Sequence, residues 1–83
     1  MTRDEVQIDM LNIVGDHLNV AHEDINDEST LESLGADSLD RVEIVMACEE
    51  KFNIQIDDDD LDGVNTFEKL VDLVTKKIGE GNN

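Results

Sequence analysis

A chain of 83 residues with a net charge of −16 is long enough for one domain with a thin hydrophobic core, and its acidity argues against nucleic acid and anionic membranes as partners. Its single cysteine, Cys48, excludes an intramolecular disulfide and a cysteine-based metal cluster. Because no apolar stretch could span a membrane and no signal-peptide pattern is present, we expect a cytoplasmic protein without stable membrane insertion.

The first predicted element is an amphipathic helix over residues 4–18, which Asn19 is expected to end. Five apolar residues follow the 3.6-residue period of one helix face: Val6, Met10, Ile13, Val14 and Leu18. Leu11 lies at the edge of this stripe and Ile8 lies outside it. Residues 19–37 are predicted to form a long polar loop, which needs anchors in so small a domain. Four apolar side chains are expected to pin it over the helices: Val20, Ile25, Leu31 and Leu34.

The second predicted helix runs from Ser38 to about Phe52. Asp37 is its expected N-cap, and Asp40 stands three residues later, in the position of a capping box. Apolar residues occur on more than one side of this helix. Leu39, Val42 and Met46 share one side, whereas Val45, Cys48 and Phe52 lie nearer another. We therefore expect part of the helix to face a partner rather than the core.

A short turn of helix is predicted from Asp58 to Asp62, with Gly63 as its left-handed cap. The last helix is expected to start after Asn65 or Thr66, with Asn65 and Glu68 as a candidate capping box, and to end at Gly79. Its buried stripe comprises Phe67, Leu70, Val71, Val74 and Ile78. Its final turn holds two cations that suit the helix dipole, Lys76 and Lys77.

These elements predict an all-α fold, a four-helix bundle of three longer helices and one short one. The predicted domain covers residues 1–79, and residues 80–83 form a flexible tail. No segment alternates with period two, so no sheet is expected.

The most informative residue is Ser38, in the run Gly35-Ala36-Asp37-Ser38-Leu39-Asp40. At a helix start, several backbone N–H groups lack partners and the helix dipole presents partial positive charge. A phosphodiester on the serine oxygen would be stabilised there. The alternative is that this Asp-Ser pair is only a helix cap.

The whole run resembles the attachment site of the acyl carrier protein family. The likeness extends along the second helix, through Leu39-Asp40, Val42-Glu43, Val45-Met46-Ala47 and Glu49-Glu50, and on to Phe52, Ile54 and Ile56. It implies that a separate Mg²⁺-dependent transferase moves 4′-phosphopantetheine from coenzyme A to Ser38. The arm would carry acyl groups as thioesters in fatty acid or related lipid or polyketide synthesis, and growing chains would enter an apolar cavity between the helices.

The resemblance also implies that the second helix docks on basic patches of acyl transferases, synthase enzymes and the phosphopantetheinyl transferase. The expected docking residues are Asp37, Leu39, Asp40, Val42, Glu43, Met46 and Glu50. Acidic side chains would speed encounter and the apolar ones would fix the register. A solvated helix face is the alternative for the acids.

Four positions depart from the familiar pattern: Arg41, Lys51, Cys48 and Asp57. The two bases interrupt the acidic surface and are expected to affect partner choice. Cys48 stands where a larger aliphatic residue is usual. It either lines a roomier cavity or is a small buried hydrophobe, and we favour the second. Asp57 stands where the family that this sequence resembles usually has a proline.

The acidic run at residues 57–60 suggests a cation site. Asp58, Asp60, Asp62 and Gly63 match the start of a calcium-binding loop, but Lys69 stands where the bidentate glutamate belongs. We therefore expect no specific metal site, only weak divalent binding at these aspartates.

We infer no enzyme activity, since His17 and His22 have no nucleophile pattern beside them. A monomeric acyl carrier is the leading hypothesis. A calcium-binding module and an unmodified helical adaptor are the alternatives. The identity and length of the acyl cargo, and a housekeeping or specialised role, stay open.

Overall fold

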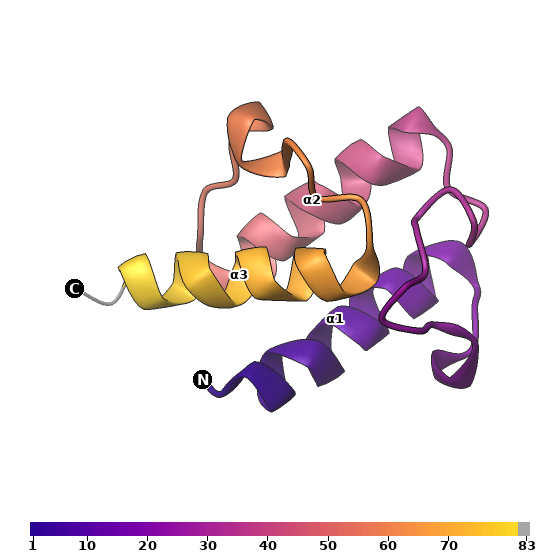
Figure 1. Ribbon diagram of the computed structural model, residues 1–83, viewed down its shortest axis with the longest axis horizontal. Helices are drawn as coiled ribbons and strands as arrows, with labels where there is room; N and C mark the ends of the chain where they lie inside the picture. Colours follow the sequence, from indigo (N-terminus) through magenta and orange to yellow (C-terminus); the bar gives the residue numbers. More distant parts are fainter. Residues whose placement is uncertain (82–83) are drawn as a thin grey trace.

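The computed structural model describes residues 1–81, which form three α-helices and two short 3₁₀ helices (Figure 1). In chain order these are α1 (Arg3–Leu18), η1 (His22–Asp24), α2 (Ser38–Phe52), η2 (Asp58–Leu61) and α3 (Phe67–Gly81). The described residues contain no strand, and the predicted all-α class is confirmed. Among these helices, none is both long and apolar enough to cross a membrane.

α1 begins and ends at local signals. The Glu5 N–H donates to the Thr2 hydroxyl (3.2 Å), and the Thr2 N–H donates back to the Glu5 carboxylate (2.8 Å), which makes a capping box. At the other end Asn19 adopts the left-handed conformation (φ 56°), and its N–H donates to the Gly15 carbonyl. The helix predicted over residues 4–18 is therefore confirmed to within one residue.

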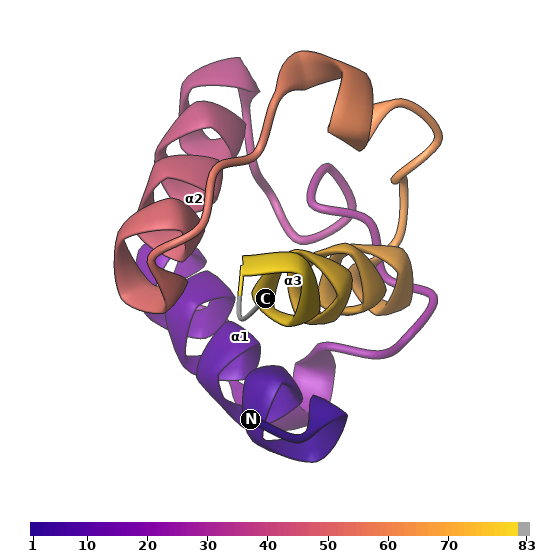
Figure 2. The ribbon, with the colours of Figure 1, turned by 90° about the vertical axis from the view of Figure 1, so that its left-hand side faces the viewer.

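The core lies between the three α-helices. α1 packs against both α2 and α3, while α2 and α3 contact each other less (Figure 2). The fully buried side chains are Val6, Met10, Val14, Ile44, Cys48, Val71 and Val74. With only two phenylalanines in the chain, the core is mainly aliphatic. η2 lies in the connection between α2 and α3, on one side of these two helices (Figure 2).

α2 is apolar on two sides, as expected. Its buried side is defined by Ile44 and Cys48, both without solvent exposure. Leu39, Val42 and Met46 are 66%, 55% and 59% exposed. Large apolar residues that exposed are unusual when they share one helix face, so this side of α2 is available to another surface.

The long loop between α1 and α2 is held in place by the start of α3. The first two N–H groups of α3, those of Phe67 and Glu68, donate to the loop carbonyls of Ser29 (2.7 Å) and Asp27 (3.0 Å). Ile25 is buried among the core residues. Val20, Leu31 and Leu34 pack against the core partly buried, so the four predicted anchors are confirmed.

α3 begins directly after Thr66, as predicted, but the predicted cap of α3 and the predicted end of η2 need correction. The Lys69 N–H donates to the Thr66 hydroxyl (3.2 Å), so Thr66 caps α3; Asn65 instead accepts from the Lys69 ammonium (3.2 Å). η2 ends at Leu61, one residue before the predicted end. Gly63 then adopts the predicted left-handed conformation (φ 79°).

The prediction that Gly79 ends α3 is wrong, because the helix continues to Gly81. An interior glycine costs a helix only about 1 kcal/mol, which neighbouring contacts can offset. Here Ile78 packs against the core, and the Lys77 ammonium bonds Asp60 on η2 (2.8 Å). Lys77 therefore lies more than a turn before the helix end and serves a tertiary contact. Of the predicted tail, residues 80–81 are helical and residues 82–83 lie outside the described residues.

Candidate functional site

Ser38 is the first residue of α2, as predicted, and it is exposed to solvent. Asp37 caps the helix: the Asp40 N–H donates to its carboxylate (2.8 Å), and the Asp37 N–H donates to the Asp40 carboxylate (3.1 Å). This predicted capping box is confirmed, and the bond from Asp37 is the main reason that the pKa of Asp40 is lowered.

The cap leaves part of the helix end unused. The Arg41 N–H donates to the Asp37 carbonyl and the Asp40 N–H is taken by the Asp37 side chain. The first two N–H groups of α2, those of Ser38 and Leu39, remain for another acceptor. A single anionic group on the Ser38 oxygen would lie beside them and beside the positive end of the helix dipole.

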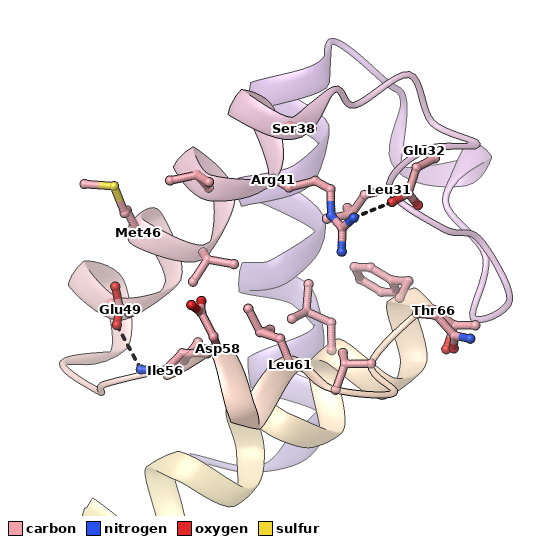
Figure 3. Close-up of a pocket in the computed structure, with 16 residues that line it drawn as sticks. Leu31, Glu32, Ser38, Arg41, Met46, Glu49, Ile56, Asp58, Leu61 and Thr66 are labelled. Atoms are coloured by element: carbon pink, nitrogen blue, oxygen red, sulfur yellow. Dashed lines mark hydrogen bonds and ion pairs between the residues drawn. The ribbon is translucent and has the colours of Figure 1, made fainter.

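A cavity of about 580 Å³ opens next to Ser38 (Figure 3). Its walls come from α2, from the loop before it, from η2 and from the start of α3. The lining residues are Leu31, Glu32, Ser38, Arg41, Val42, Val45, Met46, Glu49, Ile56, Asp58, Leu61, Val64, Asn65, Thr66, Phe67 and Leu70. Ile56, Phe67 and Leu70 are also buried, so the cavity has an apolar interior that suits a hydrocarbon chain.

Two polar contacts hold the cavity walls together. Glu49 turns inward, and its carboxylate accepts from the Ile56 N–H (2.8 Å), which ties α2 to the segment before η2. Arg41 reaches across to Glu32 in the loop, with 2.8 Å between Nη1 and Oε1 (Figure 3). Neither contact was predicted. The partners lie 7 and 9 residues apart, and no local pattern connects them.

The predicted docking residues gather around the exposed side of α2. Asp37, Glu43 and Glu50 are exposed together with the three apolar residues of that side. Asp40 is only partly exposed, because it also faces α1: His17 Nε2 lies 3.2 Å from Asp40 Oδ1 and 4.0 Å from Glu43 Oε1. The surface therefore combines an apolar centre with acidic neighbours, as complementary docking requires.

The aspartates of η2 do not form an open cation site. Asp60, the central one of the three expected ligands, is paired with the Lys77 ammonium at 2.8 Å. This bond is the main cause that lowers the pKa of Asp60, and it raises the pKa of Lys77. The Lys77 ammonium thus already neutralises Asp60, while Asp58 and Asp62 stay exposed.

Cys48 lies in the core, away from the cavity. Its sulfur is fully buried and 3.5 Å from the Met10 sulfur. Burial raises the pKa of its thiol to about 12, which keeps the thiol protonated and unreactive. The interpretation of Cys48 as a small buried hydrophobe is therefore confirmed.

Comparisons with known proteins agree with this geometry. Residues 9–74 match the phosphopantetheine attachment site family. Two acyl carrier proteins of Buchnera aphidicola subsp. Acyrthosiphon pisum, from strains Tuc7 and 5A, are 46% and 44% identical over 66 residues, which are 78% of this chain and 82% of each relative. The crystal structure of an acyl carrier protein from Thermotoga maritima aligns with a TM-score of 0.79 at 29% identity, over 96% of this chain and 94% of that one. The chain belongs to the acyl carrier protein family, whose members are non-catalytic carriers of acyl intermediates on phosphopantetheine in fatty acid synthesis.

Proposed function

We propose that Ser38 is the residue of this chain that carries the phosphopantetheine arm. The observation that supports this most directly is its place: an exposed serine at the N-terminus of α2, on the edge of an apolar cavity. Its hydroxyl makes no hydrogen bond within the described part of the chain, so it is free to react. The terminal thiol of the bound arm would supply the thioester chemistry, which Cys48 cannot.

Attachment would proceed on a separate transferase. The Ser38 oxygen forms a bond to the phosphorus of the phosphopantetheine half of coenzyme A. The bond from that phosphorus to the nucleotide half breaks, the nucleotide leaves with its own phosphates, and the serine proton is lost. The chain's contribution is to present an exposed oxygen and to stabilise the new phosphodiester with the unused N–H groups of Ser38 and Leu39.

We propose that the exposed side of α2 is the surface that partner enzymes recognise. Leu39, Val42 and Met46 would supply the apolar contact. The acidic residues around them, Asp37, Asp40, Glu43 and Glu50, would meet basic patches on the transferase and on fatty acid synthesis enzymes. Exposed charges accelerate encounter more than they add affinity, and a carrier that visits several enzymes needs brief complexes.

A monomeric carrier in the cytoplasm is the setting we propose. The support comes from composition: a strong net negative charge opposes self-association, and a single buried cysteine fits a reducing compartment.

The test is the intact mass of the protein before and after incubation with coenzyme A, Mg²⁺ and a broad-specificity phosphopantetheinyl transferase. We expect the mass to rise by one phosphopantetheine, located on the peptide that contains Ser38, and Ser38→Ala to show no rise. Circular dichroism should show that this variant keeps its helices, because Asp37 still caps α2. Modification that persists in folded Ser38→Ala would exclude Ser38 as the attachment residue.

A further inference from the structure

Arg41 is the one basic residue among those that line the cavity in the described part of the chain. The cavity's other charged residues, Glu32, Glu49 and Asp58, are all acidic. Between residues 21 and 62 the sequence contains only one other lysine or arginine, Lys51. An anion in the cavity would therefore find one cationic side chain, that of Arg41, among the lining residues.

Arg41 follows Ser38 by three residues on α2, and residues with this spacing are neighbours on one helix face. Both line the cavity, and Arg41 extends from the turn of α2 that holds Ser38 toward Glu32 (Figure 3). A guanidinium also offers paired N–H donors that match phosphate oxygens, which a compact ammonium does not. By position and by chemistry, Arg41 suits a phosphodiester on the neighbouring serine.

The present partner of Arg41 is held only weakly. The Arg41 and Glu32 side chains are 50% and 56% exposed, and exposed ion pairs of this kind add little to stability. If Arg41 leaves, water can solvate the Glu32 carboxylate, so little stability is lost. A phosphodiester on Ser38 would have the unused N–H groups of Ser38 and Leu39, but the Asp37 and Asp40 carboxylates flank it, so a cationic donor would stabilise it further.

We propose that Arg41 is a positioning residue for the arm: when Ser38 is modified, the guanidinium leaves Glu32 and binds the phosphodiester. This exchange draws the base of the arm toward the cavity opening and frees the loop around Glu32 from α2. The inference rests on the proposed attachment at Ser38. The exchange depends on the ion pair between Arg41 and Glu32 that this chain contains.

The experiment compares ¹H–¹⁵N NMR spectra of the unmodified and the modified protein, without acyl cargo. We expect the Arg41 Nε–H resonance to shift on modification, together with the amides of residues 31–33. Arg3 is the internal control, since it is the only other arginine and also forms an exposed ion pair, with Asp72 at 2.7 Å. Its Nε–H resonance should stay in place.

Two variants and a matched control complete the test. In Arg41→Gln, modification should shift only residues next to Ser38, and the response at residues 31–33 should be lost. In Glu32→Gln the arginine is already free, so its Nε–H should still shift while the loop stays silent. Lys51→Gln removes the same charge from the same helix, about 20 Å from Ser38 by helical rise, and should behave as wild type.

The outcomes separate this inference from the proposed function. If wild-type protein gains no phosphopantetheine mass, the attachment at Ser38 fails. If it gains the mass but the Arg41 Nε–H does not move, or if residues 31–33 respond equally in Arg41→Gln, the exchange of partners is overturned.

Discussion

His17 and Asp40 join the end of α1 to the start of α2, with 3.2 Å between Nε2 and Oδ1. The same carboxylate accepts the N–H of Asp37 through its other oxygen, so one side chain serves a tertiary contact and a helix cap together. Because Ser38 lies between Asp37 and Asp40, the geometry of the proposed attachment residue depends on both. The first turn of α2, which contains Ser38, is thus held against the end of α1.

The first prediction concerns the cap itself. Asp37→Ala removes the acceptor for the Asp40 N–H, and loss of such a cap costs about 0.5–2 kcal/mol of stability. Asp37→Asn keeps an acceptor oxygen and should lose much less, although it removes the same charge. Urea denaturation of the two variants measures this. Equal losses would mean that charge, rather than capping, is what Asp37 contributes to stability.

The second prediction follows from the lowered pKa of Asp40, whose main cause is the bond from the Asp37 N–H. In the unfolded chain an aspartate has a pKa of about 3.9. The ionised carboxylate therefore favours folding above that pH, and its contribution disappears as the pH falls through the lower pKa of the folded protein. The stability difference between wild type and Asp40→Asn should be constant above about pH 5 and shrink in acid.

The pH series is best measured by urea denaturation in a His17→Gln background, which removes titration of the histidine that also contacts Asp40. Other carboxylates are common to both proteins and cancel in the difference. A difference that grows below pH 4 would contradict the assigned direction.

Much of the fold could be predicted because its signals are local. The Asp37–Asp40 capping box spans three residues, and the end of α1 at Asn19 follows directly from its sequence neighbours. The apolar stripe of α3 also identifies its buried face: Phe67, Leu70, Val71 and Val74 are all buried. The sequence pattern does not identify Ile44 as fully buried, because α2 is apolar on two sides and periodicity alone does not say which side is inside.

The position of Ser38 at the start of α2 could be predicted, but the contacts around it could not. The contact between His17 and Asp40 joins residues 23 apart, and the bond from Arg41 to Glu32 crosses from a helix to a loop. Such pairs depend on how the elements pack, which no short pattern records. The end of α3 differs from its prediction for a related reason: Gly79 is a weak local stop signal, and tertiary contacts of its neighbours override it.

The third prediction concerns Cys48. With a pKa of about 12, only about one thiol in 10⁴ is ionised at pH 8, and the sulfur is also shielded from solvent. Iodoacetamide should not label the native unmodified protein, and should label it once in urea. The modified protein should take up one label in the native state, on the arm. Rapid native labelling of Cys48, located by peptide mapping, would contradict its burial.

The fourth prediction tests the proposed docking surface. Glu43→Lys should raise the KM of the transferase for this protein, and the effect should diminish as salt screens the charges. Glu23→Lys makes the same charge change on η1, outside that surface, and is the matched control. If both variants raise the KM equally, the net charge of the protein matters and the exposed side of α2 does not.

The fifth prediction compares one substitution at two helical glycines. In Gly79→Ala the new methyl group meets nothing within 4 Å, so the better helix propensity of alanine should stabilise the protein by about 0.5–1 kcal/mol. In Gly15→Ala the methyl group would lie 2.9 Å from the Val20 carbonyl oxygen. That oxygen belongs to backbone fixed by the bond from the Val20 N–H to the Gly15 carbonyl, so it cannot move away freely.

Overpacking of this kind typically costs about 1–3 kcal/mol, which outweighs the gain in propensity. Gly15→Ala should therefore destabilise the protein and Gly79→Ala should stabilise it, as measured by urea midpoints with unchanged m-values. An equal gain in stability in both variants would show that the turn at Val20 can move away from α1 without cost. The close packing of Gly15 against the Val20 carbonyl would then not be what fixes the turn after α1.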